Sequence, residues 1–208
     1  MVYEAASKLS LADYAYKTIS AAIVSGRLVS GDKLNEAKMS QQMQISRAPL
    51  REAFNRLESE GFIISLPYKG KVIADIVMEE LKEVFYPMRL MIEDYACRKA
   101  KERLVEKNYT NLLENIEQMK IACNKNDNIG VVETDLEFHR EIVKNTVSSS
   151  LYATWNSVSA KNCTYLVQVN AGLQSLYFIV DQHIEFYHTL RFGTPEEISR
   201  YLRVHFDV

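Results

Sequence analysis

The 208-residue sequence has little proline, glycine or cysteine, and it has no long uninterrupted run of apolar side chains. Its four prolines and seven glycines are too few for a collagen-like or low-complexity chain. No segment approaches the roughly 18 consecutive apolar residues of a membrane-spanning helix, and the first residues lack the apolar centre of a signal peptide. We therefore expect a globular, cytoplasmic protein that makes no contact with a membrane.

The few cysteines are scattered along the chain. Cys97, Cys123 and Cys163 are odd in number, far apart, and form no Cys-x-x-Cys pair. This arrangement argues against a disulfide framework and against a zinc site built from thiolates. We expect three free and mostly buried thiols.

Charge is distributed unevenly, although the net charge is only −2. Residues 1–76 contain ten lysines and arginines against eight acidic residues, which gives +2. Residues 77–208 contain fifteen against nineteen, which gives −4. Because proteins neutralise the phosphates of nucleic acids with basic side chains, any such contact belongs to the first segment.

The first segment shows three stretches of helical periodicity followed by two strand-like runs around a turn. The predicted helices cover 9–26, 36–44 and 47–60, and the predicted strands cover 62–66 and 71–76. Three helices followed by a hairpin is the order of elements in a winged helix-turn-helix. We therefore assign residues 1–76 to a DNA-binding domain of this type.

The second segment, residues 77–208, contains only helix signals. The predicted helices cover 78–103, 106–125, 128–146, 150–170, 173–192 and 195–206. Pro87 lies inside the first of them, where a proline costs roughly 3 kcal/mol, so we expect a kink or a break. The sequence thus predicts a mainly α protein whose second domain is an all-α bundle of six to seven helices.

The most specific stretch of the sequence runs from Met39 to Gly61. Its predicted third helix has an apolar face that includes Leu50 and Phe54, and a separate polar and basic face. A recognition helix needs this division, because one face packs against neighbouring helices while polar donors near its start enter the major groove. Cations at the hairpin turn suit an adjacent DNA backbone or the minor groove. The candidate DNA-binding residues are Ser46, Arg47, Pro49, Arg51, Asn55, Lys69, Gly70 and Lys71. The plainer alternative is a solvated helix with ordinary surface arginines.

These residues resemble the GntR family of bacterial transcription regulators. The family pattern Ser-Arg-Thr-Pro-Val-Arg-Glu-Ala-Leu is similar to Ser-Arg-Ala-Pro-Leu-Arg-Glu-Ala-Phe at residues 46–54, and the hairpin retains Gly70-x-Val72. The resemblance implies a repressor-type regulator that binds double-stranded operator DNA as a homodimer, with two recognition helices on a short inverted repeat. No heptad pattern marks the dimer surface.

All four histidines lie in the second segment. Asp135 and His139 are four residues apart, so they share one helix face. His183 and His205 fall in the last two predicted helices, at a separation that fits an antiparallel pair returning to the same level. His188 points elsewhere on its helix. Three imidazoles and one carboxylate are a mixed nitrogen and oxygen set that suits Zn, Ni, Mn or Fe(II) rather than Ca.

The same residues resemble the C-terminal ligand-binding domain of the FadR subfamily of GntR regulators. Metal-binding members carry Asp-x-x-Phe-His, then a His in a Gln/Glu-His-x-x-Ile/Phe helix, then a last His after a turn. Similar patterns occur here at 135–139, 182–186 and 193–205. The resemblance implies an antiparallel helical bundle that holds a divalent transition metal, zinc first among them, and senses a small carboxylate effector. The implied ligands are Asp135, His139, His183 and His205.

Three further residues are candidates for binding the effector. Arg89 either points its guanidinium into the bundle and pairs with a carboxylate, or lies at the surface and pairs with Glu93 one turn on. Asn162 and Tyr165 are candidates for lining the pocket.

The leading hypothesis is a ligand-responsive transcription regulator that is not an enzyme. The alternative from another class is a metal-dependent hydrolase or oxygenase, because an Asp/His site with open positions supports Lewis-acid chemistry. The sequence shows no general base beside the site, and such an enzyme would leave the helix-turn-helix without a role. Two weaker alternatives are a purely structural metal and a metal-free bundle that binds a phosphate or an acyl-CoA.

Overall fold

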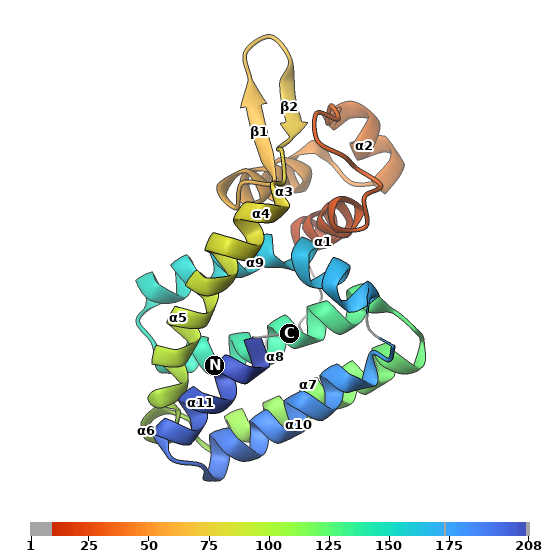
Figure 1. The fold of residues 1–208 in the computed structure, drawn as a ribbon. Coiled ribbons are helices and arrows are strands. Elements are labelled where there is room, and N and C mark those ends of the chain that lie inside the picture. The colour runs from red at the N-terminus through yellow and green to blue at the C-terminus, as the bar shows by residue number, and fades with distance from the viewer. Residues whose placement is uncertain (1–9, 173, 207–208) are drawn as a thin grey trace, which may run out of the picture. The chain divides into compact units, whose positions relative to one another are not determined.

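The computed structural model describes residues 10–172 and 174–206, and the chain divides between Ile76 and Val77 into two compact units. The first unit consists of three helices and one antiparallel β-hairpin (Figure 1). Its elements are α1 (Leu11–Val24), α2 (Glu36–Met43), α3 (Arg47–Ser59), β1 (Ile63–Leu66) and β2 (Gly70–Ile73). The predicted helix-turn-helix with a two-stranded wing is confirmed.

Local backbone chemistry sets the ends of the first helices. Ser10 caps α1, because its hydroxyl accepts a hydrogen bond from the Asp13 N–H at 3.0 Å. Gln44 ends α2 with a left-handed φ of 54°, which turns the chain toward α3. Ser46 has the extended backbone of an N-cap but makes no side-chain capping bond.

The hairpin pairs Ile63 with Ile73 at its base and Leu66 with Gly70 near its tip. Gly70 has a φ of 79°, a left-handed conformation that glycine adopts without strain. Helix α3 packs against α1, α2 and β1. Leu50 and Phe54 of α3 are fully buried, so this helix carries the core of the first unit on one face and leaves the other in solvent.

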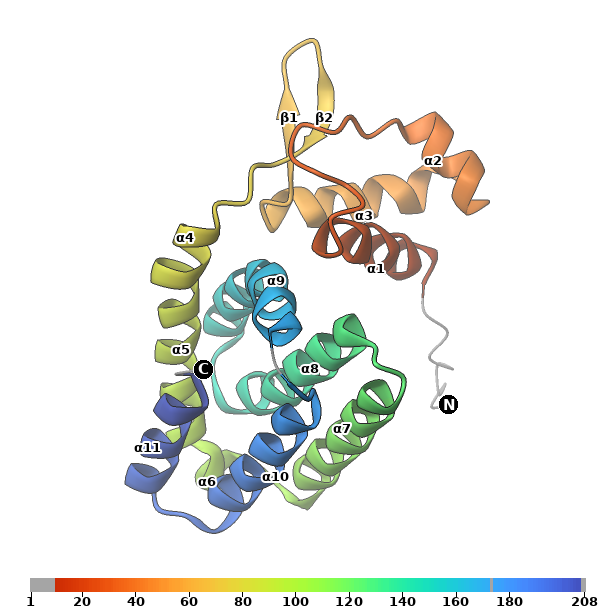
Figure 2. The same cartoon turned by 45° about the vertical axis from the view of Figure 1, so that its right-hand side comes forward.

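The second unit is all-helical, which confirms the predicted bundle (Figures 1 and 2). It consists of α4 (Met78–Glu80), a π-helical turn η1 (Leu81–Phe85), α5 (Tyr86–Arg98), α6 (Ala100–Arg103), α7 (Glu106–Asn124), α8 (Asn128–Thr146), α9 (Ser149–Ala171), α10 (Tyr177–Phe192) and α11 (Pro195–Phe206).

Pro87 is the second residue of α5 rather than an interior residue of one long helix. The π-helical turn lies immediately before it, and the N–H of Tyr86 bonds to the carbonyl of Leu81. A proline near a helix start needs no N–H donor. The irregularity expected within residues 78–103 therefore takes the form of a π turn between α4 and α5.

Helix α8 packs against α7, α9 and α5, while α10 packs against α7 and α11 packs against α5 (Figure 2). The larger apolar core includes the fully buried Met119, Phe138 and Phe186, and a smaller core surrounds Trp155. Among the described residues, no helix combines the length and the apolar character that crossing a membrane requires. The arrangement leaves polar side chains of α5, α8, α10 and α11 to meet inside the bundle.

We predict that Phe54→Ala destabilises the first unit by about 3–5 kcal/mol, because the fully buried ring leaves a cavity. Urea unfolding followed by circular dichroism measures the change. Glu52→Ala, at an exposed position of the same helix, is the matched control and should change the unfolding free energy by less than about 0.5 kcal/mol. Equal effects of the two substitutions would contradict this description of the α3 core.

Candidate functional site

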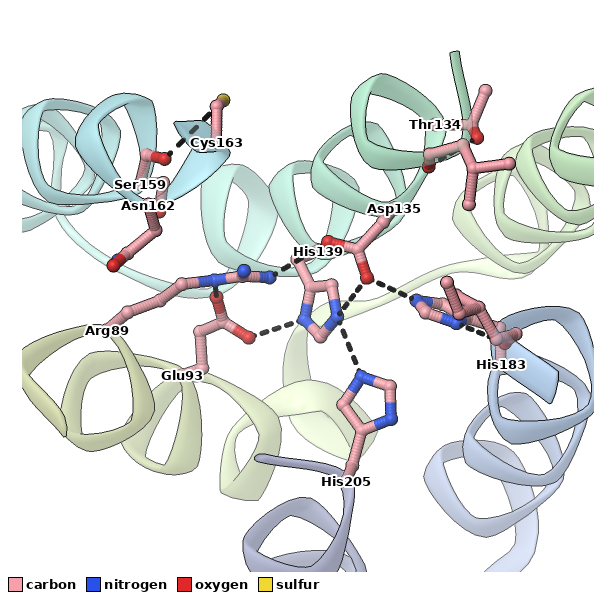
Figure 3. Close-up of polar contacts among 12 residues, drawn as sticks. Arg89, Glu93, Thr134, Asp135, His139, Ser159, Asn162, Cys163, His183 and His205 are labelled. Carbon is pink, nitrogen blue, oxygen red and sulfur yellow. Dashed lines mark hydrogen bonds and ion pairs between the residues drawn. The ribbon is translucent and has the colours of Figure 1, made fainter. Parts of the chain in front are cut away.

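Four side chains from three helices converge inside the second unit (Figure 3). Asp135 and His139 project from one face of α8, His183 comes from α10, and His205 comes from α11. One potential ligand atom of each lies within 4.8 Å of those of the other three. Both His139 and His183 are fully buried. The structure brings together the four residues that the sequence indicates, and His188 is outside this cluster.

The polar atoms of the cluster face one another at short range. Oδ1 of Asp135 lies 3.1 Å from Nε2 of His183 and 3.8 Å from Nε2 of His139. The Nε2 atoms of His139 and His205 are 3.2 Å apart. Two imidazole nitrogens at this distance share at most one proton, so at least one lone pair is directed into the cluster. Ions such as Zn²⁺ bind at about 2.0–2.2 Å from nitrogen and oxygen ligands. Two ligand atoms of one ion therefore lie roughly 3–4 Å apart, which is the spacing found here, so the donor set fits a divalent transition ion.

Burial favours the protonation states that ligate metals. Desolvation lowers the pKa of His139 and holds the pKa of His205 well below its usual value, which favours the neutral form of both rings. Burial by itself would raise the pKa of the Asp135 carboxyl group. There the close contact with His183 and the charge of Arg89 outweigh burial and lower the pKa of the carboxyl group. Neutral imidazoles and an ionised carboxylate are the forms that bind a metal ion.

Arg89 both points into the bundle and pairs with Glu93, which the sequence presented as alternatives. Its side chain is only 2% exposed, and its Nε donates to Oε1 of Glu93 at 2.6 Å. Its Nη2 also lies 3.5 Å from Oδ2 of Asp135. The one-turn pair with Glu93 therefore forms, but inside the bundle rather than at the surface. A buried guanidinium requires such partners, because its desolvation is otherwise uncompensated.

Glu93 is a site residue that sequence analysis treated only as a partner of Arg89. Its Oε2 contacts Nδ1 of His139, and its Oε1 accepts a hydrogen bond from Nε1 of Trp155 at 2.8 Å. Glu93 thus links α5 to α8 and α9. The spacing between Arg89 and Glu93 was the only signal in the sequence, because the contacts with His139 and Trp155 arise from helix packing.

A pocket lies directly beside the cluster. Its lining includes Arg89, Asp135 and His205, together with Phe178 and Gln182 of α10. A small ligand in this pocket would therefore meet a guanidinium, a carboxylate, an imidazole and an amide. The same lining also contains apolar side chains, among them Val132, Leu166 and Ile179, so the pocket combines a few polar groups with an apolar wall.

Asn162 and Tyr165 lie on α9, outside the lining of this pocket. The amide of Asn162 donates to the carbonyl of Phe85 at 3.3 Å. Tyr165 packs edge-on against Tyr86, with ring centroids 5.2 Å apart, and Tyr86 itself lines the pocket. Both residues therefore contact the segment at the start of α5 that carries the pocket wall.

The predicted DNA-binding residues of α3 lie at the surface of the first unit. Arg47, Arg51 and Asn55 are exposed along the helix. Arg51 has a side chain that is 62% exposed and pairs with Glu36 of α2 at 2.9 Å. At the start of α3, Ser46 is exposed and Pro49 is half-buried.

The side chains of the wing differ in their exposure to solvent. Lys69 and Gly70 are exposed, and Tyr68 at the tip is fully exposed with a left-handed φ of 61°. Lys71 is less exposed, because its ammonium group pairs with Glu58 of α3. Lys69 is therefore the more accessible of the two predicted wing cations.

Comparison with known proteins agrees with this geometry. Residues 11–73 match the gntR family of bacterial regulatory proteins, and residues 84–208 match the FCD domain. The chain belongs to the GntR family. Its FCD domain places it in the FadR-like subfamily, and the membership makes it a transcriptional regulator rather than an enzyme. The metal-dependent enzyme considered from the sequence is thereby set aside.

Relatives are found over most of the chain length. The gluconate operon transcriptional repressor of Bacillus licheniformis is 28% identical over 190 residues, which are 89% of this chain and 77% of that protein. The HTH-type transcriptional repressor RspR of Escherichia coli K12 is 23% identical over 195 residues, 91% of this chain and 83% of RspR. The solved structure of E. coli McbR/YncC shares the fold, with a TM-score of 0.77 at 19% identity, and covers 96% of this chain and 94% of its own.

We predict that His183→Ala abolishes stoichiometric binding of zinc, because it removes one of four converging donors. His188→Ala is the matched control on the same helix and should leave binding unchanged. Elemental analysis after dialysis against zinc gives the metal content of each purified variant. Equal zinc content in the two variants would show that the cluster is not the binding site.

Proposed function

We propose that this GntR-family protein is a ligand-responsive transcriptional repressor that binds operator DNA as a homodimer and senses a small carboxylate at a metal centre. The observation that carries the proposal is the buried convergence of Asp135, His139, His183 and His205 beside a pocket lined by Arg89. The chain that holds this cluster also carries a winged helix-turn-helix.

The four residues of the cluster would hold the metal ion. Their donor set suits Zn, and also Ni, Mn or Fe(II). When bound, such an ion supplies positive charge and open coordination positions to which a carboxylate oxygen can bind. Within the chain itself, Arg89 orients the anion from the pocket wall, and burial of the cluster keeps competing water away.

The charge balance of the site favours an anion as the ligand. Glu93 is ionised despite burial, because Arg89 and His139 lower the pKa of its carboxyl group. With Asp135 also ionised and Arg89 positive, these three side chains together carry one net negative charge. A divalent cation would reverse this to one net positive charge. A single carboxylate then restores neutrality, which is the favoured state of a poorly hydrated interior.

Several side chains of the first unit support the DNA-binding role. Arg47, Arg51 and Asn55 form an exposed polar row on α3, and Lys69 adds a cation at the wing. The ion pair of Arg51 with Glu36 lies at the surface, where such pairs contribute at most about 1 kcal/mol. Arg51 can therefore exchange this partner for a base edge or a phosphate at little cost.

The proposed homodimer has a candidate surface on α5. Met88, Met91 and Tyr95 are exposed there at i, i+3 and i+7, so they form one apolar stripe along the helix. Apolar residues in the contact between two paired helices have the same spacing. The stripe is too short to appear in the sequence as a repeated heptad pattern. A second copy of the same surface would cover it.

We predict that Arg51→Ala weakens binding to a duplex selected by the protein from a random DNA pool. The expected loss is about 1–3 kcal/mol if Arg51 makes a bidentate base contact, and base preference should relax at one position. Fluorescence anisotropy at fixed salt measures the affinity.

Lys69→Ala should instead weaken binding to all duplexes about equally and reduce the salt dependence, because a phosphate contact carries no sequence information. Titrations at several salt concentrations measure this slope. If neither Arg51→Ala nor Lys69→Ala changes affinity, the proposed DNA-binding surface is incorrect.

We predict that a chelator lowers the melting temperature and that a small organic acid raises it only when metal is present. At an acid concentration of 100 times Kd, the stabilisation is about 2.7 kcal/mol, or roughly 5–10 °C for a chain of this size. A thermal-shift screen of mono- and dicarboxylic acids, with and without chelator, tests both effects. A chelator response without any acid response would favour a purely structural metal. Stabilisation by a phosphate or an acyl-CoA in chelator would favour the metal-free alternative.

A further inference from the structure

Glu93 lies at the centre of a buried hydrogen-bond network that reaches the metal cluster (Figure 3). One of its oxygens, Oε1, accepts from Nε of Arg89 at 2.6 Å and from Nε1 of Trp155 at 2.8 Å. The other, Oε2, faces Nδ1 of His139. Oε1 therefore accepts two hydrogen bonds from outside the cluster, whereas Oε2 forms a close ion-pair contact with a cluster residue.

This contact decides which nitrogen of His139 carries the proton. A neutral imidazole has one N–H and one lone pair, and a carboxylate accepts but does not donate. Glu93 therefore favours the tautomer of His139 that is protonated at Nδ1. The lone pair is then at Nε2, the atom that faces His205 at 3.2 Å and Asp135 at 3.8 Å.

The other two imidazoles of the cluster are held differently. Nδ1 of His183 lies 2.8 Å from the backbone carbonyl of Ile179, one turn earlier on the same helix. Nδ1 of His205 has no hydrogen-bond partner among the described residues. Within that part of the chain, His139 is the histidine of the cluster whose outer nitrogen is held by a charged side chain, and that side chain comes from another helix.

We propose that Glu93 is the positioning residue of the metal centre: it holds His139 in the tautomer and orientation that direct Nε2 at the metal, and Arg89 and Trp155 hold Glu93 in place. This inference rests on the proposed metal function. Carboxylates that bind the outer nitrogen of a ligating histidine commonly contribute about 10–100-fold to metal affinity.

Glu93→Gln is the informative substitution, because it keeps the shape of the side chain. Arg89 and Trp155 both donate toward one end, so the amide oxygen of Gln would face them and its NH₂ group would face His139. Nδ1 of His139 would then have to accept, and its proton would move to Nε2, where it points into the cluster. Asp94→Asn is the matched control on the same helix, because Asp94 pairs with Arg98 instead.

The experiment measures zinc affinity of the full chain by competition with a chelating dye, after the protein has been stripped of metal. We expect Glu93→Gln to weaken zinc binding by about 10–100-fold and Asp94→Asn to leave it unchanged. If the wild-type chain binds no zinc, the proposed metal function fails, and this inference fails with it. If the wild type binds zinc and Glu93→Gln binds it equally well, only the positioning role is overturned.

A second readout separates positioning from a merely structural contribution. Nitrogen-15 NMR of the metal-free proteins should show His139 protonated at Nδ1 in the wild type and at Nε2 in Glu93→Gln. An unchanged tautomer would overturn the inference. If Glu93→Gln does not fold, Glu93→Asp preserves the charge beside Arg89 but withdraws the carboxylate from His139. That variant should also bind zinc more weakly, and undiminished affinity in it would contradict the proposal.

Discussion

The compensation of buried charge is the constraint on which the second unit depends. Arg89 and Glu93 have almost no access to water and Asp135 has little, and a buried charge left without its partner costs roughly 3–5 kcal/mol. Among the described residues, their ionic partners are one another and the rings of His139 and His183. Helices α5, α8 and α10 supply these groups, and their packing gives each buried charge a partner. Apolar contacts around Phe138 and Trp155 surround this polar network and stabilise the bundle.

The two units use charge in opposite ways. On the first unit, Arg47, Arg51 and Lys69 stay hydrated at the surface, where their partners exchange at little cost. In the second unit, the charges of Arg89, Glu93 and Asp135 are largely desolvated and held at fixed positions, where electrostatic interactions are strong. This division suits a transcriptional regulator. Hydrated cations at a surface suit contact with a polyanion, whereas charges at fixed buried positions suit a site for one particular ion or small molecule.

Membership of the GntR family explains the combination of domains, while the chemistry of the candidate metal site follows from this chain's own residues. Arg89, Glu93 and Asp135 together carry one negative charge in excess. Arg89 lies where it can serve both the internal network and the pocket. A ligand that draws Arg89 away from Glu93 or Asp135 would alter the contacts between α5 and α8, which gives the pocket a direct physical connection to helix packing.

The sequence by itself determined the elements and the four candidate metal ligands. Helical periodicity and capping residues located the helices within a few residues, and the i, i+4 spacing placed Asp135 and His139 on one face, because both depend on neighbours along the chain. Only the tertiary structure decided which side chains of different helices and strands are in contact. Glu93 meets His139 and Trp155 across three helices, and Lys71 pairs with Glu58 instead of extending from the wing. Periodicity reports that a face is buried, but the partner of that face is set by packing between distant segments.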